Sequence, residues 1–96
     1  MKITFHPHAE KELEEIESYY DGIDEELGDR FREETKTTIS RILKFPNGWQ
    51  PMSKVIRRCQ LNDFPYGIIY RLESNGIFVL AVAHLHRKQD YWTYRT

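Results

Sequence analysis

The chain has 96 residues, of which 40% are hydrophobic, 14% aromatic and 30% charged. This is the length of one domain, and the aromatic content is too high for a disordered protein, so we expect a single domain over residues 1–96. No apolar run approaches the roughly 20 residues that cross a bilayer, and the N-terminal residues contain no signal-peptide core. The lone Cys59 excludes an internal disulfide and a zinc ribbon. We therefore expect a soluble, cytoplasmic protein without membrane contact.

The net charge of −1 hides an uneven distribution along the chain. Residues 1–50 contain 7 Lys and Arg against 12 Asp and Glu, whereas residues 51–96 contain 7 against 3. The acidic half is consistent with solvated helix faces. The basic half alternates with strand-like residues and favours a surface that binds phosphate or an acidic partner.

The acidic half predicts a short strand at residues 3–5 and then two helices. Pro7 suits the first position of a helix, and the spacing of Ala9, Leu13, Ile16 and Tyr20 places them on one face. Asp21-Gly22 is expected to end this helix.

A second helix is expected to begin after Asp24, which suits an N-cap, and to stop at residues 45–48. The link between the two helices is short, so we expect an antiparallel helical hairpin. The apolar face of the second helix is formed by Leu27, Phe31, Thr35, Thr38, Ile39, Ile42 and Leu43.

From about Lys54 the hydrophobic period changes to two, which predicts three strands. The first ends at the turn residues 62–65, and the second covers residues 66–72. Asn75-Gly76 predicts a hairpin to the third strand, residues 77–83, which has no polar side chain and should be central. The predicted fold is α+β, with the order β-α-α-β-β-β and the helical hairpin packed on a small twisted antiparallel sheet.

This pattern resembles the RelE/ParE toxin superfamily of bacterial type II toxin–antitoxin modules, and within it the ParE-like branch. The resemblance covers essentially the whole chain, and Gln89 departs from the proline that the family often has there. The stretches that carry it are Phe64-Pro65-Tyr66-Gly67-Ile68-Ile69-Tyr70-Arg71, Ile77-Phe78-Val79-Leu80-Ala81-Val82-Ala83-His84, Arg87-Lys88 and Tyr91-Trp92.

The resemblance implies one of three functions. A ParE-like toxin would inhibit DNA gyrase, and a RelE-like toxin would cleave mRNA on the ribosome with Arg58, His84, Arg87 and Tyr91 as its catalytic set. A degenerate member would only bind antitoxin. RNA cleavage needs cations around the scissile phosphate. Two positions where RelE-like toxins carry cations hold Gln60 and Gly67 here, which favours the gyrase inhibitor.

The resemblance also implies a cognate antitoxin, of the ribbon-helix-helix ParD-like kind, in a toxin–antitoxin hetero-oligomer. We expect it to bind the helical hairpin and a basic rim of the sheet, through Leu13, Ile16, Tyr20, Leu27, Phe31, Arg57 and Arg71. The target is expected to contact the C-terminal tail through Arg87, Lys88, Tyr91, Tyr94 and Arg95.

Other residues have a structural interpretation. His84 and His86 project from one face of a strand end, but the sequence offers no further ligands, so we expect no metal and no cofactor. Trp92 is expected to close over the sheet, with Tyr94 and Arg95 exposed beyond it. Cys59 should be a core residue, and Trp49 is either a lid on the core or a contact residue.

Overall fold

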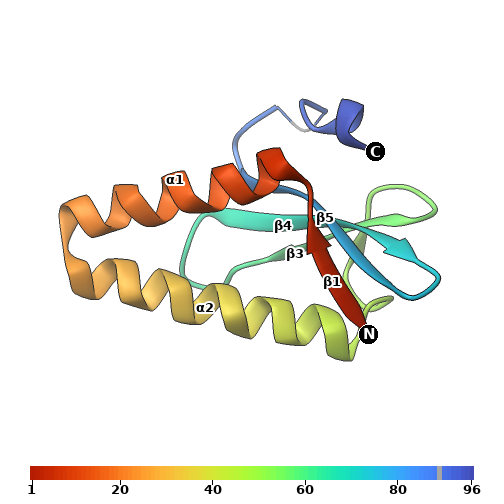
Figure 1. The fold of residues 1–96 in the computed structure, drawn as a ribbon, viewed down its shortest axis with the longest axis horizontal. Helices are drawn as coiled ribbons and strands as arrows, with labels where there is room; N and C mark the ends of the chain where they lie inside the picture. The colour runs from red at the N-terminus through yellow and green to blue at the C-terminus, as the bar shows by residue number, and fades with distance from the viewer. Residues whose placement is uncertain (89) are drawn as a thin grey trace.

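The computed structural model describes residues 1–88 and 90–96, so the expectation about Gln89 lies outside the described residues. A five-stranded sheet has the order β1-β5-β4-β3-β2 and carries two helices on one face (Figure 1). The elements are β1 (Lys2–Phe5), α1 (Pro7–Ile23), α2 (Glu25–Lys44), β2 (Gln50–Pro51), β3 (Ile56–Gln60), β4 (Tyr66–Glu73), β5 (Gly76–His84) and the short 3-10 helix η1 (Thr93–Arg95). This confirms the predicted α+β class and the order of the principal elements.

The helical hairpin forms largely as its capping residues predict. Pro7 is the first residue of α1, and the Nδ1 atom of His6 accepts a hydrogen bond of 3.0 Å from the backbone N–H of His8. Asp24 is the N-cap of α2, where its carboxylate accepts from the N–H of Glu26 at 2.9 Å. The expected break at residues 21–22 was one to two residues early, because α1 continues to Ile23 and Asp24 ends it by donating its N–H to the carbonyl of Tyr20.

The sheet is mixed, which corrects the prediction of an antiparallel one. β1 runs parallel to β5, while the remaining neighbours pair antiparallel. Parallel neighbours require a long crossover, and here the helical hairpin and three strands separate β1 from β5 in the chain. Strand β2, which the sequence did not predict, adds a short edge beside β3.

The β4–β5 hairpin is confirmed, although Gly76 has a different role from the expected one. The two-residue loop is Ser74–Asn75, and Gly76 already pairs with Glu73 in the sheet. A Cβ atom at Gly76 would lie 2.2 Å from the carbonyl oxygen of Lys2. Glycine is therefore required because β1 approaches β5 closely at this position.

A bulge in the central strand β5 places two consecutive residues on the same face of the sheet. Ile69 pairs with Ala81 and Tyr70 pairs with Val79, so Leu80 is the extra residue. Val79 contributes to the core under the helices, and both Leu80 and Ala81 join a second cluster that contains Trp92. The expected burial of this strand on both sides is confirmed, and so is the expected closure by Trp92, which is 5% exposed.

The core under the helices is rich in aromatic rings. Phe31 and Tyr70 are completely buried, and Tyr20 packs against Phe31 and Phe64 with ring centroids 5.3 Å and 5.0 Å apart. Cys59 is buried as expected, and Trp49 is a partly buried residue at the margin of this core. Among the described residues, no helix combines the length and apolar character needed to span a membrane.

Candidate functional site

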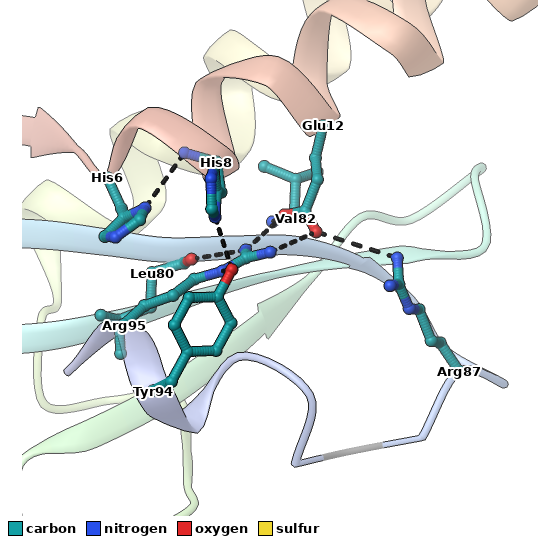
Figure 2. A network of polar contacts seen from close by, with 8 residues as sticks. All are labelled: His6, His8, Glu12, Leu80, Val82, Arg87, Tyr94 and Arg95. Carbon is teal, nitrogen blue, oxygen red and sulfur yellow. Dashed lines mark hydrogen bonds and ion pairs between the residues drawn. The ribbon is translucent and has the colours of Figure 1, made fainter.

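The edge of β5 changes partner where β1 ends. The backbone N–H of His6, just after β1, donates to the carbonyl of Val79 at 2.8 Å. Beyond that point, the N–H of Val82 donates to the Glu12 carboxylate at 3.0 Å, and the carbonyl of Leu80 accepts from Arg95 at 3.0 Å (Figure 2). Two side chains, one from α1 and one from η1, therefore occupy the hydrogen-bonding positions that a longer β1 would have filled.

Glu12 and Arg95 also form a two-pronged ion pair. The Nη1–Oε1 and Nη2–Oε2 distances are 2.9 Å and 3.2 Å, and the side chains are only 14% and 6% exposed. Arg87 approaches the same carboxylate at 3.9 Å. Burial alone would lower the pKa of Arg95, but hydrogen bonds to Glu12 and Tyr94 outweigh it and raise the pKa, so the guanidinium stays charged.

The burial of Arg95 corrects the expectation that this residue is exposed at the tip of the tail. Arg95 supplies a cation to the part of β5 that β1 does not cover. Without it, the Leu80 carbonyl and the Glu12 carboxylate would lose a buried hydrogen-bond partner. The C-terminal tail is thus attached at two points, by the Trp92 ring and by the Arg95 ion pair.

Tyr91 lies between two guanidinium groups. The Cζ atom of Arg87 is 3.6 Å from the centroid of its ring, and that of Arg95 is 5.1 Å away. Its hydroxyl is buried, and burial, followed by the neighbouring Glu12 carboxylate, raises the pKa of Tyr91 strongly. A phenol held in this way stays protonated and is poorly suited to act as a general base.

Tyr94 is the exposed member of the tail. Its side chain is 64% exposed, and its hydroxyl contacts the Nδ1 atom of His8 at the start of α1 (Figure 2). The ring of His6 lies nearby, 6.4 Å from that of Tyr94 between centroids. Burial, then the neighbouring His8 and Arg95, lowers the pKa of His6, which keeps its Nδ1 atom free to cap α1.

The four residues considered for RNA cleavage do line one cavity, but it is almost filled. Arg58, His84, Arg87 and Tyr91 surround a volume of about 10 Å³, together with Met52, Ile69, Ala83, Leu85, Lys88 and Trp92. A cavity of this size holds at most one water molecule. We call it the tail cavity.

Gly67 explains how Arg58 is positioned in the tail cavity. A Cβ atom at Gly67 would lie 3.0 Å from both Cγ and Cδ of Arg58, so the arginine stem occupies the space above this glycine. The Nη2 atom of Arg58 then donates to the Gln50 side chain at 2.7 Å. Glycine at position 67 therefore provides no cation of its own. It also leaves space for the Arg58 side chain, which extends across the sheet to Gln50.

The residues expected to bind antitoxin divide into two groups. Phe31 is fully buried, and Ile16 and Tyr20 are each 9% exposed, so these three form the core and not a surface. The prediction overlooked that the sheet needs a hydrophobic cover, which the apolar faces of the helices provide. Leu13 and Leu27 are partly buried at the margin of this core.

The two arginines of this set have local partners. Arg57 donates to the carbonyl of Trp49 at 2.8 Å, and Arg71 pairs with Glu73 at 2.7 Å while lying over the ring of Phe78. Of the residues expected to contact a target, the structure leaves Arg87, Lys88 and Tyr94 exposed, Tyr91 partly buried and Arg95 buried.

Glu12 is the important residue that the sequence reasoning missed. It follows Ala9 by three positions and precedes Ile16 by four, so the helical period places it on the buried face of α1. A carboxylate on such a face requires a buried partner, and that requirement was the available signal.

Comparisons with known proteins agree with this architecture. Residues 3–91 match the family model described as the ParE toxin of the type II toxin-antitoxin system, parDE. The chain is 30% identical over 84 residues to Toxin ParE2 of Mycobacterium tuberculosis, in both the CDC 1551 / Oshkosh and the H37Rv strains, covering 86% of this chain and 80% of the relative.

A solved structure, described as the chromosomal ParDE TA system from P. aeruginosa, has the same fold. Its TM-score is 0.74 at 16% identity, and the match covers 88% of this chain and 95% of that one. The resemblance noted in the sequence is therefore confirmed. The chain belongs to the ParE toxin family of type II toxin–antitoxin systems.

Proposed function

We propose that this ParE-family toxin inhibits DNA gyrase by binding it, without cleaving RNA, and that a cognate antitoxin neutralises it. The observation that carries the proposal is the nearly filled tail cavity, where the four residues considered for a nuclease meet but leave no room among them for a phosphodiester. About 10 Å³ of free volume accommodates a single oxygen atom and not a nucleotide.

The chemistry of the residues around the tail cavity supports the same conclusion. RNA cleavage requires a base for the 2′-hydroxyl and cations at the developing phosphorane. Tyr91 is protonated between two arginines, Arg58 is engaged by Gln50, and Gly67 provides no cation. An RNase mechanism would have to begin with displacement of the tail and of the ion pair that holds it.

The exposed side of the tail is the surface that we assign to the target. Arg87, Lys88 and Tyr94 are exposed side chains of the same C-terminal tail, two cations and an aromatic ring, and Trp92 and Arg95 fix this tail to the sheet. A rigid support lowers the entropic cost of presenting such side chains to a partner. Tyr91 and Arg95 then act by supporting this surface and do not contact the target themselves.

We assign antitoxin binding to the exposed parts of the helical hairpin and the basic sheet rim. Tyr19 and Ile23 are 60% and 59% exposed on α1, and Leu27 lies partly buried nearby on α2. Exposed apolar side chains of this kind are suitable anchors for the apolar face of an amphipathic helix. Arg57 and Arg71, on the neighbouring strands β3 and β4, would receive acidic residues in exchange for their present partners, the Trp49 carbonyl and Glu73. A ribbon-helix-helix antitoxin with an extended C-terminal segment could reach both regions.

Induced expression in a bacterium tests the function directly. Gyrase inhibition predicts filamentous cells, induction of the DNA-damage response and loss of supercoiling activity when the purified toxin is added to gyrase. The ribonuclease predicts an early stop in translation and mRNA cut on the ribosome, with cleavage abolished by Arg87→Ala. That result would refute the proposal.

Co-expression with the neighbouring gene product distinguishes the remaining alternative. A toxin predicts growth arrest that this gene product relieves. A degenerate member predicts no arrest at all, although the two proteins would still copurify. Tyr19→Ala and Ile23→Ala should weaken the copurification if the helical hairpin carries the antitoxin contact.

A further inference from the structure

Residues that line the tail cavity carry buried hydrogen-bond donors without acceptors, and this feature points to a ligand. Trp92 is only 5% exposed, and its Nε1 atom has no hydrogen-bond partner among the described residues. The Nε atom of Arg58 is also buried and unpartnered in that part of the chain. Both residues line the same cavity. The hydroxyl of Tyr91, which lines the cavity as well, is likewise buried without a hydrogen-bond partner among the described residues. Buried donors are nearly always paired in folded proteins, so three unpaired donors at one cavity require an explanation.

We infer that the tail cavity receives one oxygen of a carboxylate from an acidic segment of a partner protein. The lining supports an anion, because its titratable members are Arg58, His84, Arg87, Lys88 and Tyr91, and none of the described lining residues is Asp or Glu. A ligand at this place must therefore bring the acceptor, and charge complementarity gives that acceptor a negative charge.

The size of the cavity determines how the ligand fits. About 10 Å³ admits a single oxygen, so only the tip of the carboxylate enters. The second oxygen and the rest of the side chain then lie at the rim, where Arg87 is 55% exposed and Lys88 is also exposed. One carboxylate can thus satisfy the buried donors and pair with the cations at the rim.

A protein carboxylate fits this site better than nucleic acid. Proteins that bind single-stranded nucleic acid stack bases on exposed aromatic rings along a cationic groove. Here Tyr91 is covered by Arg87 and Trp92 is buried, so neither ring is free to stack on a base. The inference goes beyond the proposed function, which assigns no ligand to the tail cavity.

Nuclear magnetic resonance of the isolated chain offers a direct test, because Trp92 and Trp49 give separate indole N–H signals. The Nε1 atom of Trp49 donates to the carbonyl of Arg41 at 3.2 Å, so its signal is an internal control. The probes are acetate, orthophosphate, a short RNA oligonucleotide and two short capped peptides that differ only in Asp against Asn. We expect acetate and the Asp peptide to shift the Trp92 signal in a saturable way, while the Trp49 signal and the Asn peptide show no comparable effect.

Substitutions identify the binding groups. Arg58→Gln should weaken binding of the Asp peptide by about tenfold or more, as the loss of a charge-assisted hydrogen bond typically does. Lys88→Gln changes an exposed rim residue that cannot disturb the fold and should also weaken binding. Arg30→Gln, an exposed arginine on α2, is the matched control and should leave it unchanged.

Two results would overturn the inference. If no probe moves the Trp92 signal, the cavity holds a water molecule only. If orthophosphate or RNA shifts it at much lower concentration than the carboxylates do, the site is a phosphate site. An unchanged Trp49 signal in each variant shows that the protein is folded and the comparison valid.

Discussion

Replacing Arg95 with alanine tests whether the last residues of the chain hold the fold together. In the structure this guanidinium satisfies both the Glu12 carboxylate and the carbonyl of Leu80, and its side chain is 6% exposed. The substitution would leave a carboxylate that is 14% exposed without its closest cation.

The size of the effect follows from that burial. Removing one partner of a buried ion pair costs about 3–5 kcal/mol, because the remaining charge stays desolvated. Arg87, at 3.9 Å, and the N–H of Val82 still stabilise Glu12, so we expect a loss near the lower limit, about 3 kcal/mol. In a domain of this size 1 kcal/mol corresponds to about 4–8 °C, so the melting temperature should fall by about 12–24 °C.

Thermal unfolding followed by circular dichroism measures this change. Tyr94→Ala is the comparison variant, because it removes an adjacent side chain that is 64% exposed and accepts only a long bond of 3.3 Å from the Nε atom of Arg95, so it should change the melting temperature far less than Arg95→Ala does. The double variant Glu12→Ala with Arg95→Ala should be less destabilised than the sum of the single variants, since the two side chains act on each other.

An Arg95→Ala protein that melts within about 3 °C of the native chain would refute the reasoning. So would a double variant whose loss of stability equals the sum of the two single losses. Either result would mean that the tail contributes to stability through Trp92 alone and that the ion pair is dispensable.

Three further predictions concern the core, the sheet and the target. Gly76→Ala should destabilise the protein by about 1–3 kcal/mol in urea denaturation, because its Cβ would collide with the Lys2 carbonyl, whereas Gly22→Ala, which meets nothing within 4 Å, should be neutral or stabilising. Burial raises the pKa of Tyr70 to about 12, and its hydroxyl donates to the carbonyl of Pro46 at 2.7 Å. Because the folded state holds this proton more tightly than the unfolded state, the stabilisation is complete below about pH 10 and declines by up to about 2.7 kcal/mol as the pH rises through 12. Tyr70→Phe should show a smaller decline over that range, and an equal decline in both proteins would contradict the assignment. Tyr94→Ala should lower growth arrest and gyrase inhibition at unchanged protein level and melting temperature, and undiminished toxicity would place the target surface elsewhere.

The local elements of this protein could be predicted from the sequence because their signals are local. Pro7 and Asp24 mark helix starts through backbone geometry and side-chain capping, which depend only on adjacent residues. The alternation from residue 55 onward and the apolar run at residues 77–83 identified the meander and its central strand, since a side-chain period of two reflects the strand itself. The family resemblance depended on the same C-terminal stretches.

Contacts between distant parts of the chain were decided only by the tertiary structure. The pairing of β1 with β5 sets the direction of the edge strand and explains why position 76 is glycine. Neither feature has a local signature, because the neighbour of an edge strand depends on how the whole chain crosses the sheet.

The tail shows this most clearly. From its sequence Arg95 was an exposed cation suited to a partner, yet it lies buried against Glu12, 83 residues away. Residues 77–83 predicted a buried strand, but not that β1 ends beside Val79 and leaves a carbonyl and an N–H for side chains to satisfy. Whether a polar side chain binds a partner or closes the fold depends on which backbone groups the packed sheet leaves without hydrogen bonds, and that is determined only when all its strands are in place.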